Sequence, residues 1–280
     1  TCSARVPVYT LLISLLFANR PMAAALTFTG AYALGIVAAL VMAWVFKRTI
    51  LRGETRPLVI ELPNYKIPSL RNAVLLTIDR AMVFIKNAGT TILLIIIALW
   101  ALSTFPQATI EDLSPQVQTQ LAELEAAGET EAADNLLAKE SLEYSLAGRI
   151  GRTIEPVFAP LGFDWKMSIG VVSSFAAREV IVSTLAVLYG MGDEGGESAG
   201  FTESLRASTH RDGSPVFTIA ACLSLLVFYV LAMQCLPTQV ITKRETGSWK
   251  WAGLQFGYMT VLAYVASLAT YQTALAFGLG

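Results

Sequence analysis

The chain has 280 residues, of which 54% are hydrophobic and only 15% are charged, and its formal net charge is −1. Soluble domains usually carry about 25% charged residues, so this shortage, together with several long apolar stretches, indicates a protein that is solvated by lipid. The nearly neutral charge gives no support to nucleic-acid binding, and three scattered cysteines are too few for a disulfide framework.

Three apolar segments of different lengths lie in the first part of the chain. Residues 6–17 predict a helix of about 12 residues, roughly 18 Å long, whereas a bilayer core of about 30 Å needs roughly 20 residues. Residues 27–46 and 88–105 are each expected to span the membrane. The basic segment between them, residues 47–86, holds eight Lys or Arg against three acids. Its prolines predict extended and short helical pieces near the membrane surface.

An acidic segment follows, because residues 106–147 contain nine acids and one lysine without any long apolar run. It predicts two solvated helices that turn near Gly128. After it, bulky apolar residues recur every four positions, as expected of an amphipathic helix lying in the membrane interface, with Pro156 and Pro160 limiting its length. The recurring residues are Leu146, Ile150, Ile154 and Phe158.

The last part of the chain alternates apolar segments with polar loops. Residues 167–189 are apolar except for Arg178 and Glu179, and the apolar residues 216–242 are interrupted at Cys235 and Pro237. The remaining expected pieces are a Gly-rich polar loop at 190–214, a short basic loop at 243–250 and a final span at 252–277.

The charges decide how residues 167–189 are read. The positive-inside rule places the basic segment in the cytoplasm, and the acidic segment then lies outside. A full crossing by residues 167–189 would put the basic loop at 243–250 outside, against the rule. A re-entrant hairpin that turns near residues 173–174 or 178–179 removes the conflict. Non-helical backbone at that depth is tolerated only inside protein or along a wet cavity, so the hairpin implies a pathway.

Arg178 and Glu179 are the first candidates for function. A charge near the centre of a bilayer costs about 2.5–3.5 kcal/mol on insertion scales, so such residues are kept where they pair or face a polar cavity. A structural ion pair that ties helices together is the alternative. Neighbouring residues on a helix point in different directions, so each side chain is expected to find its partner elsewhere.

Two cysteines precede prolines that break helices. Cys2 lies five residues before Pro7, and Cys235 lies two residues before Pro237. Broken helices free backbone carbonyls and expose dipole ends, and a thiolate there suits a borderline or soft transition metal. The alternative is that each free cysteine is a small hydrophobic residue. That alternative is favoured for Cys222, which lies in an uninterrupted apolar stretch.

Long ordered motifs resemble the FeoB family of bacterial ferrous iron transporters, and they cover nearly the whole chain outside the acidic segment and the polar loop. Arg178 stands where that family more often has lysine, and Cys235 follows glutamine where many members have proline. The matching motifs are CSARVPVY (residues 2–9), KRT (47–49), LRGET (51–55), ELPNY (61–65), GRIGRTIEP (148–156), PLGFDWK (160–166), REVIVSTL (178–185) and RETGSWKW (244–251).

The resemblance implies a permease core for ferrous iron in the bacterial inner membrane, not an enzyme. It implies Cys2, Cys235 and Glu179 as transient Fe²⁺ ligands along the path. Arg5, Pro7, Arg178 and Pro237 are expected to be gate or structural residues. No permanently bound cofactor is expected. Full-length relatives carry an amino-terminal GTP-binding domain, and we expect it upstream of this chain, which opens in mid-motif.

The expected fold is all-α: a polytopic membrane bundle with broken or re-entrant helices and an extramembrane helical insertion. We expect three parts, with the first gate region in residues 1–105, the insertion and interfacial helix in 106–165, and the second gate region in 166–280. Expected partners are Fe²⁺, the lipid bilayer, the upstream GTPase domain and small FeoA-like proteins, with a homo-oligomer left open. The alternatives are a gate-type transporter of another divalent metal or a nucleoside, and a non-transporting membrane scaffold.

The sequence makes a prediction about nucleotide binding. It contains no G-x-x-x-x-G-K-[ST] phosphate-binding loop, so we expect the purified chain to neither bind nor hydrolyse GTP. Equilibrium binding of a fluorescent GTP analogue to the 280-residue chain measures this directly. Saturable binding at micromolar nucleotide would show that the prediction is wrong.

Overall fold

The structure is a computed structural model that describes most of the chain. The described residues are 3–18, 20–50, 69–86, 90–106, 115–126, 136–137, 140–141, 144–175, 178, 180–189, 199–209, 213–232 and 235–279. Among them the regular structure is helical, with a single isolated β-bridge between Thr209 and Pro215. The expectation of an all-α fold is therefore confirmed for the described residues.

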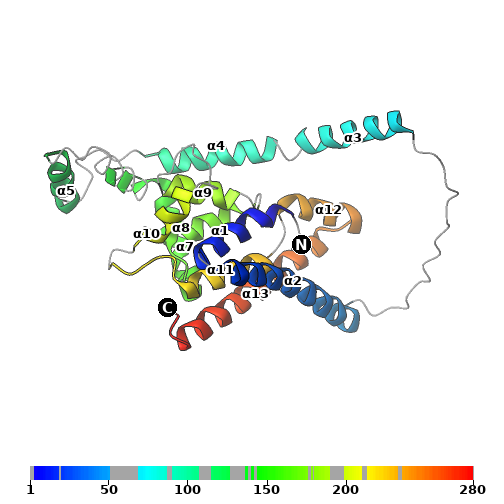
Figure 1. Cartoon of the computed structure of the whole chain (residues 1–280). Helices are drawn as coiled ribbons and strands as arrows, with labels where there is room; N and C mark the ends of the chain where they lie inside the picture. The colour runs from blue at the N-terminus through cyan, green and yellow to red at the C-terminus, as the bar shows by residue number, and fades with distance from the viewer. Residues whose placement is uncertain are drawn as a thin grey trace.

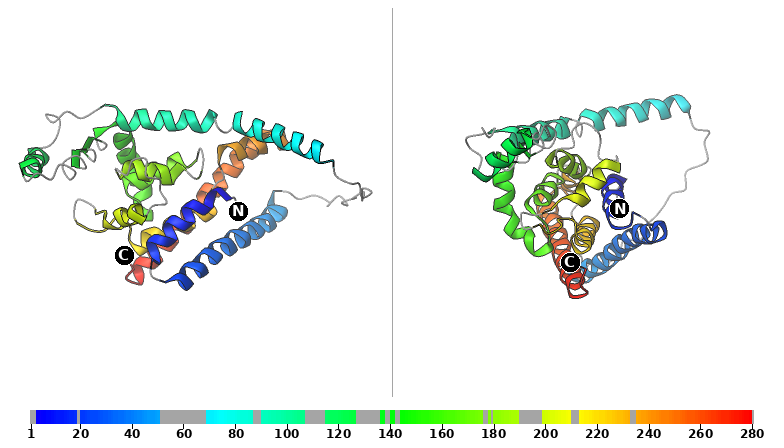
Figure 2. Two further views of the ribbon diagram at one scale, coloured as in Figure 1. Left: turned by 45° about the horizontal axis from the view of Figure 1, so that its top comes forward. Right: turned by 60° about the vertical axis from the view of Figure 1, so that its left-hand side comes forward.

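The helices form a bundle, with α3 and α4 following one another along one side of it (Figure 1 and Figure 2). The elements are η1 Ser3–Arg5, α1 Val6–Leu16, α2 Pro21–Thr49, α3 Leu70–Phe84, α4 Thr90–Thr104, α5 Pro115–Ala126, α7 Leu146–Phe158, η4 Ala159–Leu161, α8 Trp165–Ser173, α9 Val180–Leu188, α10 Ala199–Ala207, α11 Ile219–Leu231, α12 Leu236–Thr246 and α13 Trp249–Ala276.

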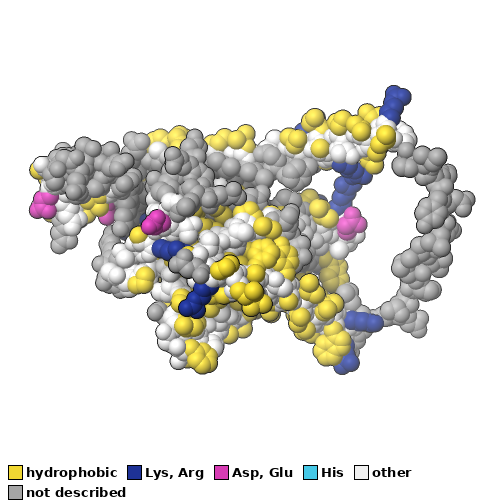
Figure 3. Space-filling view, in the orientation of Figure 1, with side chains coloured by type: hydrophobic (Ala, Val, Ile, Leu, Met, Phe, Trp, Pro, Cys, Tyr) yellow, Lys and Arg dark blue, Asp and Glu magenta, His cyan; other side chains and the backbone are white. Residues whose placement is uncertain are grey.

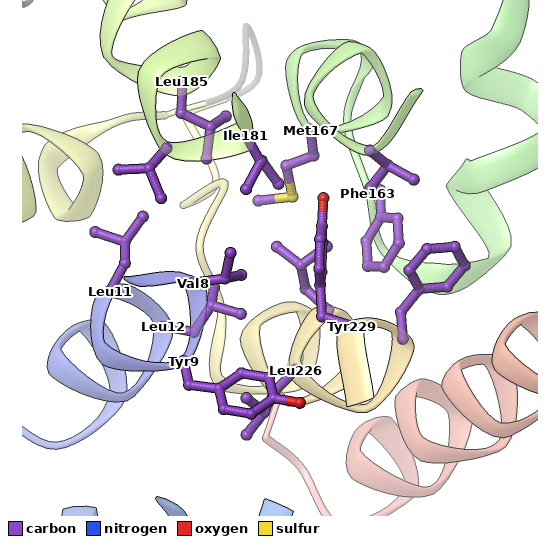
Figure 4. Close-up of a cluster of buried hydrophobic side chains, with 14 of the residues drawn as sticks. Val8, Tyr9, Leu11, Leu12, Phe163, Met167, Ile181, Leu185, Leu226 and Tyr229 are labelled. Atoms are coloured by element: carbon purple, nitrogen blue, oxygen red, sulfur yellow. The ribbon is translucent and has the colours of Figure 1, made fainter. Parts of the chain in front are cut away.

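Helix α11 lies at the centre of the bundle and packs against α13, α1, α2 and η4. Ten of its thirteen residues are buried, because apolar side chains surround it on all sides. Figure 4 shows Leu226 of α11 beside Tyr9 of α1, and Tyr229 pointing toward Phe163 and Met167. The first gate region and the last part of the chain therefore share one hydrophobic core.

Hydroxyl groups join α11 to α13 inside this core. The Ser224 and Ser267 hydroxyl oxygens lie 2.7 Å apart, and each side chain also donates to the other residue's carbonyl, at 3.2 and 3.0 Å. Both side chains are fully buried. Small hydroxyl residues let two helices approach closely and hydrogen-bond across the contact, as is common between helices in membranes.

Two helices are long and apolar enough to cross a bilayer among the described residues, namely α2 with 29 residues and α13 with 28. At about 1.5 Å per residue each is longer than a hydrocarbon core of about 30 Å. Both expose large apolar side chains, and Figure 3 shows hydrophobic atoms spread over much of the visible face, with few charges between them. Length and composition therefore support two spans. The finer expectation of a polytopic bundle remains a proposal.

The other apolar helices are shorter than a membrane is thick. Helix α1 has 11 residues, which confirms the half-length helix predicted for residues 6–17. Helix α4 has 15 residues, so among the described residues it falls short of the full span expected for 88–105. Helix α11 has 13 residues and ends well before α12 begins. The predicted interruption near Cys235 is therefore present.

Residues 167–189 fold into two helices of nine residues each, α8 and α9, which pack against each other. The Ser173 and Thr184 hydroxyl oxygens lie 3.1 Å apart across this contact. Gly170 lies so close to Ile181 that an added Cβ would come within 2.9 Å of its Cγ1. Neither helix alone can cross a bilayer, so the predicted turn within 167–189 is present. Its entry and exit on one side of the membrane remain a proposal.

The interfacial helix forms as α7, and it also packs against α8 through a face that the sequence reasoning did not consider. Its buried residues are Ala147, Gly148 and Gly151, which lie against α8, and a Cβ on Gly151 would come within 2.7 Å of Ile169 Cδ1. Leu146 and Ile150 are exposed instead. Small residues are buried because only they allow such close approach. Of the bulky stripe, Leu146 and Ile150 are thus free to meet lipid, whereas Phe158 packs against the rings of Phe163 and Phe228. The helix also continues past Pro156 to Phe158.

Three loop predictions need correction. The expected Gly-rich loop at 190–214 contains α10, whose Phe201 and Leu205 are completely buried. Most of the expected basic loop at 243–250 is helical, because α12 continues to Thr246 and α13 begins at Trp249. Within the basic segment, residues 70–84 form the single regular helix α3, all of whose described side chains are exposed. Residues 51–68, which hold the three prolines, lie outside the described residues, as does the turn near Gly128.

Gly162 should be a sensitive position for stability. Its φ is +82°, and a Cβ there would overlap the ring of Tyr271 on α13. We expect Gly162→Ala to destabilise the protein by at least about 1–2 kcal/mol, the cost of a left-handed residue with a side chain. Thermal unfolding of the detergent-solubilised chain measures this.

Gly30→Ala is the matched control. Gly30 is helical and no heavy atom lies within 4 Å of an added Cβ, so alanine should be neutral or slightly stabilising. Equal melting temperatures for Gly162→Ala and the parent would contradict the close contact between η4 and α13.

Candidate functional site

The candidate site is the break between α11 and α12. Helix α11 ends at Leu231, and Cys235 is the N-cap residue of α12, with Pro237 in the first turn. Proline suits a first turn because the amide hydrogen it lacks would have no helical partner there. The break therefore brings the carbonyl end of one helix and the amide end of another to the same short segment. Residues 233–234 lie outside the described part of the chain.

Two buried arginines bind the carbonyl end of α11. Arg5 donates from Nη1 to the Val230 carbonyl at 2.7 Å and from Nη2 to the Ala232 carbonyl at 3.2 Å. Arg178 donates from Nη1 to the Tyr229 carbonyl at 3.3 Å and from Nη2 to the same Ala232 carbonyl at 2.8 Å. The last carbonyls of a helix have no amide partners in the helix and carry the negative end of its dipole. Cationic donors satisfy both needs at once.

The two arginines reach this point from distant parts of the chain. Arg5 closes the 3-10 turn η1 directly before α1, and Arg178 lies between α8 and α9. Each side chain is only 4% exposed. The Arg178 guanidinium carbon also lies 5.6 Å from the centroid of the Tyr229 ring. The first gate segment, the α8–α9 pair and the end of α11 are therefore held together by backbone carbonyls at one place.

This arrangement corrects one expectation from the sequence. A broken helix was expected to free backbone carbonyls for a metal ion. In the structure, the carbonyls of Tyr229, Val230 and Ala232 already accept hydrogen bonds from guanidinium groups. The physical reason is that unpaired carbonyls are costly in an apolar interior, so the fold supplies cations of its own to satisfy them.

Cys235 is the metal-ligand candidate whose position the structure describes. It is partly buried, and its Sγ lies 3.8 Å from Thr238 Oγ1 in the first turn of α12. It also interacts electrostatically with Arg178. The thiol therefore lies at the break, beside the cationic groups that hold α11.

The other predicted residues are distributed as follows. Cys2 and Glu179 lie outside the described residues, so the proposed set of Cys2, Glu179 and Cys235 stays a prediction. Pro7 lies in the first turn of α1, as Pro237 does in α12. Within the described ranges no three histidine, cysteine or acidic residues come together as a metal site.

Cys222, for which the sequence favoured a packing role, is buried in the first turn of α11, at the end of the helix opposite the break. It lies 13 positions before Cys235 in the sequence, in the continuous part of the helix and away from the break. Nothing in its surroundings points to a ligand, so the preferred interpretation as a small hydrophobic residue stands unchanged.

Sequence reasoning did not single out Gln239, which lies one turn after Cys235 on α12. Its side chain is 6% exposed, and its Nε2 atom has no hydrogen-bond partner among the described residues. Residues four apart lie on the same face of a helix, so Cys235 and Gln239 share a face of α12. An amide can present either its oxygen or its nitrogen by rotation. The available signal was the presence of glutamine at position 239 within the apolar stretch 216–242.

Arg206 was also overlooked because it lies in the expected polar loop. It donates from Nε to the Leu15 carbonyl at 3.3 Å and from Nη2 to the carbonyls of Leu15 and Ser14. These are the last carbonyls of α1, so a third arginine caps the end of this half-length helix. Arginines from other segments therefore cap the carbonyl ends of both α1 and α11, in an exposed position at α1 and in a buried one at α11.

The loop before α8 holds another buried polar group that the sequence reasoning passed over. Asp164 accepts a hydrogen bond from the Met167 amide at 2.8 Å and caps α8. Lys166 is buried with its Nζ 4.2 Å from the centroid of the Tyr189 ring. These residues belong to the motif PLGFDWK, in which two charges next to an apolar stretch were the available signal.

Comparison with known proteins gives two family matches. The model described as "Ferrous iron transport protein B C terminus" matches residues 28–80, and the gate model described as "Nucleoside recognition" matches residues 85–249. The second match alone covers more than half of the chain and includes the α11–α12 break. No solved structure matches the chain.

Curated relatives agree with these matches. The Fe(2+) transporter FeoB of Leptospira biflexa is 39% identical over 282 residues, covering 99% of this chain and 38% of the relative. FeoB of Leptospira interrogans is 38% identical over 97% of this chain and 37% of the relative. A Porphyromonas gingivalis protein named as a fusion of Fe(2+) transport protein A and FeoB is 36% identical over 99% of this chain and 33% of the relative.

This chain thus spans less than two fifths of the length of each of these relatives. Their similarity nevertheless runs along almost all of the chain. The FeoB carboxy-terminal match and the gate match follow one another along the chain, at residues 28–80 and 85–249. The chain therefore belongs to the FeoB family and contains its gate region together with the segment matched by the carboxy-terminal family model.

Proposed function

We propose that this chain is the permease core of a ferrous iron uptake system in the bacterial inner membrane. The observation that carries the proposal is the break between α11 and α12, where a thiol lies at the junction of two helix ends in a family whose relatives are named Fe(2+) transporters. Broken helices of this kind form the ion sites of many secondary transporters. The chain would act as a transporter, and its relatives' names describe transport.

Fe²⁺ suits such a site chemically. It binds nitrogen, oxygen and sulfur ligands more weakly than most later first-row metals do. A transport site needs this, because the ion must leave as well as enter. Cys235 at the break would supply a thiol ligand, and we propose that Cys2 and Glu179 complete the set. Iron is the cargo here, and no resident cofactor is part of the proposal.

Several partners follow from the same proposal. The GTP-binding domain expected upstream would regulate the permease. A small FeoA-like protein is a reasonable partner, because one relative is named as a fusion of the two proteins. Helices α2 and α13 would cross the membrane, with the basic segment after α2 in the cytoplasm, and further crossings would make the protein multi-pass. A homo-oligomer is left open.

The α8–α9 pair gives a test of topology. If residues 167–189 enter and leave the membrane on one side, single cysteines at Ser114 and Ser198 should react with an impermeant maleimide from outside. A cysteine at Ser248, in the N-cap of α13, should react from the cytoplasmic side. Labelling in intact cells and in inverted vesicles measures both. Reaction of Ser114→Cys and Ser198→Cys from opposite sides would show that the segment crosses fully.

Two other functions remain as alternatives. The gate model's description names nucleoside recognition, so a nucleoside or another divalent metal could be the cargo. A membrane scaffold that transports nothing is the third possibility. Competition by Mn²⁺, Zn²⁺ or uridine in an uptake assay separates the cargoes. A scaffold predicts that Cys2, Glu179 and Cys235 can all be changed without effect on uptake.

The central prediction compares the thiol of Cys235, at the break, with the buried thiol of Cys222. Cys235→Ser should lower Fe²⁺ uptake by roughly tenfold, equivalent to about 1.4 kcal/mol of lost ion stabilisation. Cys222→Ser is the matched control, because that thiol is buried away from the break, and uptake should stay near the parent's. Uptake of ⁵⁵Fe²⁺ by cells that carry the full-length protein, normalised to membrane-inserted protein, measures both.

Glu179→Gln distinguishes a ligand from a structural carboxylate. A ligand role predicts reduced uptake with normal amounts of inserted protein, whereas a purely structural role predicts reduced insertion. Normal uptake by a Cys2→Ser/Cys235→Ser double variant would remove the thiols from the mechanism.

A further inference from the structure

The inference concerns what the two buried arginines do when an ion passes, and it rests on the proposed iron permease function. Together Arg5 and Arg178 place four hydrogen bonds on three carbonyls at the end of α11. The C-terminal ends of half-helices are where several transporters coordinate the transported cation, because the dipole and the carbonyl oxygens both favour positive charge. The guanidinium groups therefore occupy the place that a passing cation would take.

Electrostatics make this arrangement a strained one. Neither guanidinium forms an ion pair with a carboxylate among the described residues, and the two groups repel each other. Burying a charge costs several kcal/mol unless good partners repay it. The dipole at the end of α11 supplies only about half of an elementary negative charge against two positive ones. The Ala232 carbonyl must also serve both cations.

Hydrogen bonding around the arginines is incomplete. Arg5 Nε and the hydroxyls of Tyr9 and Tyr229 are buried without a hydrogen bond of normal geometry within the described part of the chain, although the Tyr9 hydroxyl approaches Arg5 and the Tyr229 hydroxyl approaches Ser174. Tyr9 is nevertheless close enough to Arg5 and Arg178 to interact with both electrostatically. A fully satisfied polar network rigidifies a core, whereas a partly satisfied one holds less firmly. The repulsion between the two arginines and the incomplete hydrogen bonding around them both favour opening of this contact.

We propose that Arg5 and Arg178 form a cation-sensitive clasp over the end of α11. In the closed state the guanidiniums occupy the carbonyls of Tyr229, Val230 and Ala232, and their charge keeps Fe²⁺ away from Cys235. Opening withdraws at least one guanidinium, which frees carbonyl oxygens for the ion beside the thiol. The arginines are thus tethered competitors of the cargo, so entry of the ion and release of the clasp are coupled.

Removing one charge should therefore open the clasp. Arg178→Gln keeps an amide that can still hydrogen-bond a carbonyl but removes the cation. If the open fraction rises by about tenfold, the rate at which Cys235 reacts should rise by the same factor, and the Fe²⁺ concentration that half-protects it should fall by that factor. Arg178→Lys keeps the charge, so Cys235 in this variant should react at a rate close to its rate in the parent.

The experiment uses two versions of the whole chain in lipid nanodiscs, and both keep Cys2 because it is a proposed ligand. Cys222→Ser leaves Cys235 as the probe, Cys235→Ser leaves Cys222, and peptide mass spectrometry reads the labelling of each probe separately from that of Cys2. Each carries Arg178→Gln, Arg178→Lys or Arg5→Gln, and a small maleimide is added with and without Fe²⁺ under anaerobic conditions. The expected result is faster labelling of Cys235 in both glutamine variants, while labelling of the buried Cys222, in the first turn of α11, stays slow.

The outcomes separate the clasp from a structural role. An equal rise at Cys222 would show that the whole core has loosened and would overturn the proposal. Unchanged labelling of Cys235 in folded Arg178→Gln or Arg5→Gln protein would overturn it as well, so the test survives if one variant does not fold. Faster labelling of Cys235 without Fe²⁺ protection in any variant would support the clasp and count against iron as the cargo.

Discussion

The structure depends on how a helix can stop inside an apolar bundle. Helix α11 is buried along most of its length and ends at Leu231, where its last carbonyls can reach no solvent and no amide of their own helix. Leaving them unpaired in such surroundings would cost several kcal/mol each. Arg5 and Arg178 solve the problem with four hydrogen bonds, and this single contact joins segments separated by as many as 227 positions in the sequence.

A second short helix is capped in a similar way. Arg206 of α10 donates to the last carbonyls of α1, although this contact is exposed. Because the capping arginines come from other segments, α1 and α11 are each tied to neighbours through their backbone carbonyls. Close contacts at Gly151, Gly170 and the Ser224–Ser267 pair then bring the helices near enough for these arginines to reach. Capping and close packing support each other.

A guanidinium group that satisfies the carbonyls at a helix end also prevents another cation from binding to them. A transporter of positive ions gains from this, because the groups that stabilise the closed bundle are the groups that exclude the cargo. The proposed clasp and the proposed permease therefore follow from one arrangement. Cys235 lies at the amide end of α12, on the other side of the break from the capped carbonyls, and it interacts electrostatically with Arg178.

Much of this fold could be predicted from local sequence alone. The half-length first helix and the interruption near Cys235 follow from the lengths of apolar stretches and the positions of proline, which are local properties. The turn within residues 167–189 follows from the charges of the loops on either side of it. The family could also be identified from the motifs. The helix α10 and the buried face of α7 were not predicted, because apolar residues in a polar loop and glycines on a helix acquire meaning only against the neighbour that they touch.

The sequence by itself determined that the chain is solvated by lipid, that its architecture is helical and to which family it belongs. Each of these conclusions rests on residues near one another in the chain. The tertiary structure alone decided the partners of the charges. The sequence could say that Arg178 needs a partner but not that it shares a carbonyl of Ala232 with Arg5. A backbone carbonyl carries no signature in the sequence, because every residue has one, and only the folded chain shows which carbonyls are left without an amide.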